Sequence, residues 1–368
     1  MNKQPSLLSP AVLFALLLVT LLGTDFLTSP HDAARFCGAS GYWAPPAAFI
    51  LAVPFILLLY FFQRRFPGDD LFAAARASLG KYAAAAGNGL FLLVFLAWLV
   101  AALRDGGELA IGYFFSRTPL WAVVAFVMLG AAYAAVNGLS AIGRLASFVL
   151  LPTVALRLGI KLLAFDGLET SHLLPLFSAR PLDCLRGGLA LAGSLGPLAG
   201  VLLFHPSLAD RERFLPVTLS AAGGALFIAL VGIVGTIGVF GAEFTQDFTW
   251  PNLASVQRVN LPYLAIEQVG LLFLIVWLTM WLVALAFIVQ IAALGIAGRF
   301  RPALNRTAAA VIAVVALIGA ILIPDAGLIH LALATVRRWA IVPLAGYILL
   351  VYFVSLVRRP VPKRIGGG

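Results

Sequence analysis

Three residues in the first apolar segment, Gly23, Thr24 and Asp25, are of types that could bind a polar ligand inside a membrane. They interrupt an apolar run that starts at Leu7. Backbone groups exposed by such a break cost several kcal/mol each unless water, an ion or a ligand satisfies them. A hydroxyl and a carboxylate at the break could hold an ammonium group or a cation. The alternative is that Gly23 simply ends the first helix near the membrane surface.

A second interruption lies at Gly193-Ser194-Leu195-Gly196-Pro197. Pro197 has no backbone N–H and glycine disfavours helix, so the helix is predicted to unwind here. The half-helix that follows would present free N–H groups and a positive dipole end to a carboxylate, and Ser194 would add a hydroxyl. The alternative is close helix packing through Gly196 and Gly200. Together the two breaks would suit a zwitterion such as an amino acid, with ligand-binding candidates Gly23, Thr24, Asp25, Gly193, Ser194, Gly196 and Pro197.

The other reactive residue types form no recognisable catalytic or metal site. The four histidines are scattered, and no nucleophile, base and orienting group can be assembled around any of them. There is no phosphate-binding glycine-rich loop. Cys37 and Cys184 are predicted in connecting segments, without metal-ligand spacing; they are two free thiols or, if both face an oxidising compartment, a disulfide. We therefore expect no enzymatic activity, no cofactor and no metal.

Two further sets of charges are predicted near the outer surface. Glu267, at the start of the eighth span, is expected to reach the surface, with a buried role as the alternative. Arg104, Asp105 and Glu108, at the end of the third span, are interpreted as an outer charge cluster.

The elements that must position these residues are transmembrane helices. Of the 368 residues, 62% are hydrophobic and 11% are charged, which is typical of an integral membrane protein. Since a span needs roughly 20 apolar residues, the sequence predicts ten, with no connection long enough for a soluble domain, so residues 1–368 form one polytopic domain. The predicted spans are 7–28, 44–62, 86–103, 119–136, 145–165, 188–205, 217–240, 264–297, 307–323 and 339–357.

The net charge of +10 is interpreted as a topology signal and as contact with anionic lipid rather than with nucleic acid. With the amino terminus in the cytoplasm, more than half of the 25 basic residues fall in inner segments. Both termini are therefore predicted to be cytoplasmic. The inner basic residues are Lys3, Arg64, Arg65, Arg76, Lys81, Arg144, Arg211, Arg213, Arg299, Arg301, Arg306, Arg358, Arg359, Lys363 and Arg364.

Ten spans divide into two groups of five, and an odd number per group inserts the second group upside down. This parity permits an inverted repeat with residues 7–165 as the first half, 188–357 as the second and 358–368 as a cytoplasmic tail. In such folds, interruptions at matching places in the two halves indicate a binding site near the middle of the membrane. The breaks in spans 1 and 6 match in this way.

Several motifs, taken in order, resemble the GerAB-type spore germination permeases, the membrane B subunits of nutrient germinant receptors, within the amino acid/polyamine/organocation transporter superfamily. No single motif is decisive, but their order and spacing together are fairly specific. The motifs are TLLGTDFLTSP with Gly41-Tyr42-Trp43, Arg117-Thr118-Pro119, Asn137-Gly138-Leu139-Ser140 with Arg144-Leu145, Leu203-Phe204-His205-Pro206, Trp250-Pro251-Asn252-Leu253, Glu267, Trp277 and Pro324-Asp325.

The resemblance implies a LeuT-like, all-α fold of ten spans in which spans 1 and 6 unwind around a small nutrient, commonly an amino acid. It also implies A-type and C-type partner subunits in the inner membrane of the spore, and a ligand that triggers germination. Two positions depart from the family pattern. The family's glycine, small residue, glycine reads Gly23, Thr24, Asp25 here, and Gly200 stands where many relatives have glutamate. The acidic group displaced to Asp25 is hypothesised to compensate for the one absent at Gly200.

The function expected from the sequence is thus that of a receptor-type permease. The rival is a secondary symporter of amino acids or cations, in which Asp25 coordinates the coupling ion. A membrane scaffold with a degenerate pocket is a third possibility.

Overall fold

The computed structural model describes residues 8–24, 28–258, 269–298, 301–323, 335–336 and 338–358. Within these ranges the chain is helical, apart from a short backbone bridge between Leu8 and Leu208. The α-helices are α1 (Pro10–Thr24), α2 (Ser29–Cys37), α3 (Ala44–Arg65), α4 (Leu71–Leu79), α5 (Lys81–Tyr113), α6 (Leu120–Val136), α7 (Leu139–Ala164), α8 (Pro181–Ala192), α9 (Phe214–Asp247), α10 (Pro251–Gln257), α11 (Val269–Ala297), α12 (Pro302–Leu322) and α14 (Ile341–Arg358). The 3-10 helices are η1 (Gly38–Trp43), η2 (Phe165–Gly167), η3 (Thr170–Leu173), η4 (Gly193–Leu203) and η5 (His205–Ser207).

Each of the ten predicted spans contains a helix. Eight helical stretches in the described ranges are long and apolar enough to cross a bilayer, and α1 and α6 are shorter apolar helices. The observed helices often extend beyond the predicted limits. For example, α5 starts at Lys81, because polar residues at a helix end lower local hydropathy without ending the helix. Helix α9 is kinked at Gly241, whose φ of +76° is not helical, so its break lies directly after the predicted end of the seventh span.

The predicted connection after the first span is wrong, because the chain there forms a second helix. Helix α2 carries His31, Asp32 and Arg35 within nine residues, so its hydropathy resembles that of a loop. Cys37 is its last residue, and Cys184 lies on α8, so neither cysteine is in a connecting segment. Both thiols are free, and the Cys37 thiol donates to the Asp183 carbonyl of α8 at 3.7 Å.

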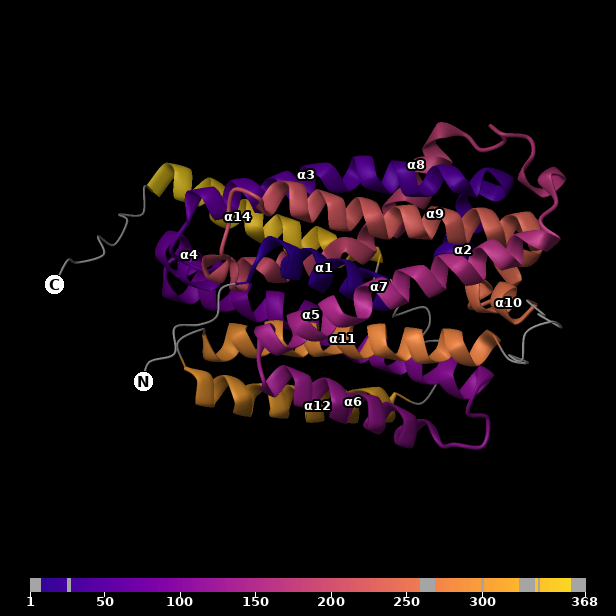
Figure 1. Cartoon of the computed structure of the whole chain (residues 1–368). Coiled ribbons are helices and arrows are strands. Elements are labelled where there is room, and N and C mark those ends of the chain that lie inside the picture. The colour runs from indigo at the N-terminus through magenta and orange to yellow at the C-terminus, as the bar shows by residue number, and fades with distance from the viewer. Residues whose placement is uncertain are drawn as a thin grey trace.

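The long helices run side by side along the bundle (Figure 1). Helices α5, α6, α11 and α12 pack together on one side, and α3, α8 and α9 pack together on the other. Between these groups, α1 packs against α7, α9 and α11. Every residue of α1 from Ala15 to Thr24 is buried, so its uniformly apolar sequence reflects an interior position.

Local sequence signals set several helix ends. Asp70 caps α4, its carboxylate accepting a hydrogen bond from the Ala73 N–H at 2.9 Å. Gly80 then separates α4 from α5 with a φ of +83°, a conformation that strains other residues. Proline lies in the first turn of α3, α8 and α12, where its missing N–H costs no helical hydrogen bond.

One end of the bundle is fastened by basic side chains, and we call it the basic end. Arg65 donates to the Ser355 carbonyl at 3.0 Å, and Arg358 donates to the Ser78 carbonyl at 3.3 Å. Arg211 donates to the Pro67 carbonyl. The start of α1 is joined to this end through the Leu8–Leu208 bridge. The start of α1 and the end of α14 therefore share one end of the bundle, as an even number of spans requires.

Candidate functional site

The first break lies between α1, which ends at Thr24, and α2, which begins at Ser29. Asp25 lies outside the described residues. Gly23 belongs to α1 and does not open it; a Cβ at Gly23 would lie 2.5 Å from the backbone oxygen of Met280 on α11. The Thr24 hydroxyl donates to the Thr20 carbonyl at 3.2 Å, within its own helix. Gly23 is therefore a packing residue, and the chain leaves α1 only after Thr24.

The sixth span changes helix type at the predicted place but does not unwind there. Helix α8 ends at Ala192, and the 3-10 helix η4 continues from Gly193 to Leu203. Helical backbone angles at Gly193 leave no extended segment, so the predicted opening with free N–H groups is wrong. The physical reason is that a 3-10 helix bonds each N–H three residues back, which keeps the chain helical around Pro197.

The length of η4 is itself unusual. It has 11 residues, whereas 3-10 runs beyond three or four residues are uncommon and often mark hinges. Gly196 allows this segment to pack under Trp98 of α5, because a Cβ there would lie 2.5 Å from the indole ring. At Gly200, a Cβ would lie 2.9 Å from the Ile291 side chain of α11. Glycine at position 200, where many relatives have glutamate, therefore lets η4 pack closely against α11.

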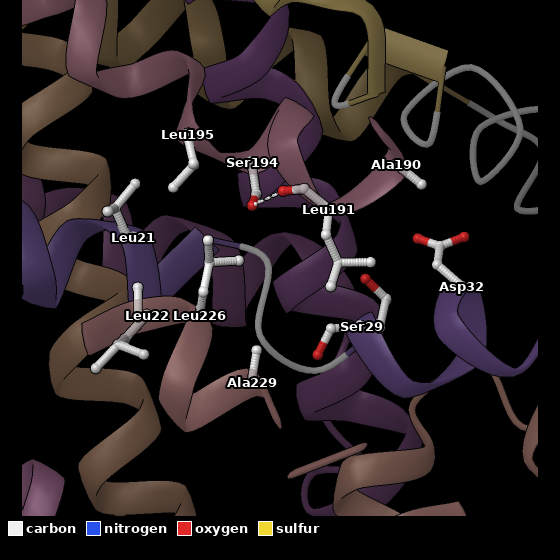
Figure 2. A pocket seen from close by; sticks show the side chains of 12 residues that line it. Leu21, Leu22, Ser29, Asp32, Ala190, Leu191, Ser194, Leu195, Leu226 and Ala229 are labelled. Carbon is white, nitrogen blue, oxygen red and sulfur yellow. Dashed lines mark hydrogen bonds between the residues drawn. The ribbon is translucent and has the colours of Figure 1, made fainter. Parts of the chain in front are cut away.

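A cavity lies where the two interruptions meet (Figure 2). Four segments contribute to it: the end of α1, the start of α2, the junction of α8 with η4, and the middle of α9. Its polar side chains are Thr28, Ser29, Asp32 and Ser194. The apolar lining consists of Leu21, Leu22, Ala190, Leu191, Leu195, Ala225, Leu226 and Ala229.

Among the predicted site residues, Ser194 lines this cavity, and its hydroxyl donates to the Leu191 carbonyl at 2.5 Å. Gly23, Thr24, Gly193, Gly196 and Pro197 are close in sequence to lining residues but are not themselves part of the lining. The breaks thus predicted the place of the cavity better than they predicted its side chains.

Asp32 is the cavity residue that sequence reasoning missed. It lies on α2, which hydropathy had assigned to a connection, and its carboxylate borders the cavity (Figure 2). Its Oδ1 atom is 3.3 Å from NH2 of Arg338, which precedes α14. The signal available in the sequence was an acidic residue within one or two helical turns of a predicted break.

The free space in the cavity is small. It amounts to about 30 Å³ for water-sized molecules, where one water needs about 10–15 Å³ by this measure. This space holds about two water molecules and is smaller than a free amino acid. Ligand entry requires the four lining segments to separate.

Two buried cations lie on the other side of α1, on α7. Arg157 donates to the carbonyl oxygen of Leu22 at 3.2 Å and contacts Sδ of Met280 at 3.5 Å. Because Leu22 also lines the cavity, Arg157 supports the α1 end of the site. Arg157 and Lys161 were not predicted as functional residues, although charges inside a span are the established signal for such a role.

Lys161 is enclosed by hydroxyl groups. Its Nζ donates to Thr236 Oγ1 of α9 at 3.2 Å and to Ser255 Oγ of α10. Thr236 also donates to the Gly232 carbonyl at 2.7 Å, and Ser255 to the Asn252 carbonyl at 2.9 Å. The amino group therefore joins α7, α9 and α10 through neutral oxygens, an arrangement we call the Lys161 cage.

The two sets of charges that were predicted near the outer surface differ in what the structure shows of them. Glu267 lies outside the described residues. The predicted outer cluster on α5 is buried instead: Arg104 is 8% exposed and Asp105 is 9% exposed. Arg104 pairs with Glu108 at 2.7 Å and donates to the Ala320 carbonyl of α12 at 3.0 Å. These contacts form because α5 continues to Tyr113, nearly three turns past the predicted end of its span.

The chain is similar in sequence to known spore germination proteins. A family model described as "Spore germination protein" matches residues 7–326. Spore germination protein YndE of Bacillus subtilis (strain 168) is 21% identical over 282 residues, covering 76% of this chain and 78% of YndE. Spore germination protein B2 of the same organism is 24% identical over 268 residues, covering 70% of each chain.

Solved transporter structures share the fold. Mhp1, a nucleobase-cation-symport-1 family transporter in a closed conformation with bromovinylhydantoin bound, superposes with a TM-score of 0.69 at 18% identity, over 97% of this chain and 82% of Mhp1. MhsT in complex with L-phenylalanine gives a TM-score of 0.63 at 13% identity, over 94% of this chain and 98% of MhsT.

At these identities the structural matches establish the fold and not the ligand. The ten-span, LeuT-like architecture with interrupted helices 1 and 6 is confirmed. The division into repeats at 7–165 and 188–357 remains a prediction. Since the family model covers most of the sequence, this chain belongs to the spore germination protein family of membrane permeases.

Proposed function

We propose that this protein is the membrane subunit of a nutrient germinant receptor, and that it binds a small polar ligand, in the simplest case an amino acid, at the cavity between α1–α2 and α8–η4. The observation that carries this proposal is the position of the cavity. It lies at the gap between α1 and α2 and at the change of helix type in the sixth span, and it gathers Ser29, Asp32 and Ser194.

Signalling would follow from a shift between closed and open conformers. A ligand moves such an equilibrium only by its difference in affinity for the two states. A tenfold preference corresponds to about 1.4 kcal/mol. Partners of the A and C types in the inner spore membrane would amplify this difference, and both chain ends would face the cytoplasm at the basic end of the bundle.

Asp25 keeps its proposed role in ligand binding, together with Gly23, Thr24, Gly193, Gly196 and Pro197. The glycines and Pro197 shape the backbone, while Thr24, Asp25 and Ser194 supply polar groups.

We expect a cognate ligand to stabilise the purified protein in a thermal unfolding assay across amino acids, sugars, nucleosides and monovalent cations. Ligand at 100 times its dissociation constant adds about 2.7 kcal/mol to the free energy of unfolding. Asp25→Asn should abolish the stabilisation. If the variant responds to the same ligand as the unchanged protein does, Asp25 has no part in binding. If no compound stabilises the protein even with its partner subunits present, the receptor proposal fails and a scaffold remains.

A working symporter is the second candidate, because the structural match to Mhp1 is to a transporter. Flux of the labelled ligand into liposomes that contain the purified chain alone would support it. A receptor should bind the ligand without flux and should need its partners for an output.

A further inference from the structure

We propose that Asp32 recognises a cationic amine of the ligand and that Arg338 occupies the same carboxylate when no ligand is bound. The proposal rests on the ligand site above and adds the chemical class of the ligand and the contact that keeps the site closed. Asp32 lines the cavity, and its carboxylate also forms an ion pair with Arg338.

The lining of the cavity favours a cation over an anion. Asp32 is the one ionisable side chain among the described lining residues, and the other polar groups are the hydroxyls of Thr28, Ser29 and Ser194. A carboxylate surrounded by hydroxyls and apolar side chains stabilises a positive charge and repels a negative one. The amine of a zwitterion is thus directed toward α2.

The Asp32–Arg338 pair has the strength expected of a contact that a ligand can replace. Both side chains are about one quarter exposed, at 25% for Asp32 and 26% for Arg338. Their atoms approach to 3.3 Å, longer than a well-formed charge-assisted hydrogen bond of about 2.7–2.9 Å. Partly exposed ion pairs of this kind are weak, so an amine with better geometry can displace the guanidinium.

Arg338 also has a second contact, which does not involve Asp32. Its guanidinium lies 5.1 Å from the centroid of the Phe36 ring, one turn after Asp32 on α2. Cation–π contact with this ring would hold the arginine after it releases Asp32. Release would then leave α2 without its ionic contact to the segment before α14, and would let the closed cavity widen.

The chain offers a matched control for this arginine. Arg35 is exposed and lies 6.0 Å from the centroid of the same Phe36 ring, but its described contacts include no ion pair with Asp32. Arg338→Gln and Arg35→Gln therefore remove the same charge from neighbouring positions, and Arg338→Gln alone removes the competitor for Asp32.

Binding is tested with L-alanine and L-valine, with their deaminated counterparts propionate and isovalerate, and with the amines ethylamine and isobutylamine. At least one of the four amine-bearing compounds should bind. The carboxylic acid with the same side chain but no amine, propionate or isovalerate, should not. Arg338→Gln should tighten binding of the amine-bearing compound roughly threefold to fivefold, the worth of a partly exposed ion pair. Arg35→Gln should leave binding unchanged, and Asp32→Asn should weaken it by about tenfold or more.

The inference is overturned if the deaminated acids bind as well as the amines, if Asp32→Asn changes nothing, or if none of the four amine-bearing probes binds. A sugar or nucleoside that stabilises the protein independently of Asp32 would overturn it while leaving the receptor proposal intact. The absence of any ligand, with partners present, would overturn both.

A measurement without ligand tests directly whether the Asp32–Arg338 ion pair holds the cavity closed. In protein with Cys37 and Cys184 replaced by serine, Ala229→Cys places a thiol in the cavity wall. Arg338→Gln should raise its rate of labelling by N-ethylmaleimide severalfold in folded, monodisperse protein, and Arg35→Gln should not. Equal rates in all three proteins would show that the ion pair does not hold the cavity closed.

Discussion

Gly23→Ala is expected to destabilise the protein and to abolish ligand binding. The added Cβ would lie 2.5 Å from the backbone oxygen of Met280 and 2.9 Å from Cβ of Ala284. Backbone on a fully packed helix cannot move aside as a flexible side chain can, so α1 must shift away from α11. Overpacking of this kind costs about 1–3 kcal/mol, more than the gain of up to about 1 kcal/mol from replacing glycine with alanine in a helix. Thermal unfolding in detergent measures the difference.

Gly89→Ala is the matched control. Gly89 lies within α5, and a Cβ there would meet nothing within 4 Å. This variant should unfold at the same temperature as the unchanged protein or above it, because alanine is the better helix former. If Gly23→Ala behaves in the same way, α1 does not contact α11 as closely as the structure shows.

The second large effect on stability is expected in the Lys161 cage. Removing the two hydroxyl groups should cost more stability than removing the amino group. Removing both acceptors with Thr236→Val and Ser255→Ala leaves a buried amino group without its hydroxyl partners, at a cost on the order of 3 kcal/mol or more. Removing the amino group with Lys161→Met should cost about 1 kcal/mol or less, because both hydroxyls keep carbonyl acceptors in their own helices. The comparison is again made by thermal unfolding.

The triple variant decides whether these effects share one cause. When Lys161→Met is added to the two hydroxyl deletions, most of the lost stability should return, because no buried amino group then lacks a partner. Thr218→Val is the control on α9: Thr218 is buried, and its hydroxyl donates to the Phe214 carbonyl of its own helix at 2.8 Å. Additive losses in the triple variant would contradict the cage.

The location of the cavity has a consequence for signalling. Its walls come from α1, α2, α8–η4 and α9, while Arg157 and the Lys161 cage brace the same α1 and α9 from the side of α7. Widening the cavity therefore strains the hydrogen bonds that Arg157 and Lys161 of α7 make with α1 and α9. A long 3-10 segment such as η4 is uncommon and often marks a hinge, which makes it a suitable place for the conformational change.

The membrane architecture follows from the amino-acid sequence alone. In lipid every backbone polar group must be satisfied within its own segment, so apolar runs of sufficient length must be helices. The ten predicted spans followed from this rule. Gly23, Thr24, Gly193 and Pro197 also located both interruptions to within a few residues, because glycine and proline act on the backbone locally.

The residues that line the cavity at those interruptions depend on contacts between segments that are distant in sequence. Asp32 was missed because the polar helix α2 has the hydropathy of a loop, although its residues Ser29 and Asp32 line the cavity. Whether Gly23 opens a helix or lets α11 approach depends on a neighbour about 257 residues away in sequence, Met280. The form of the sixth span likewise depends on Trp98 and Ile291, which pack against Gly196 and Gly200. Local sequence sets where a helix can break, but contacts between distant segments set whether it unwinds, tightens or packs.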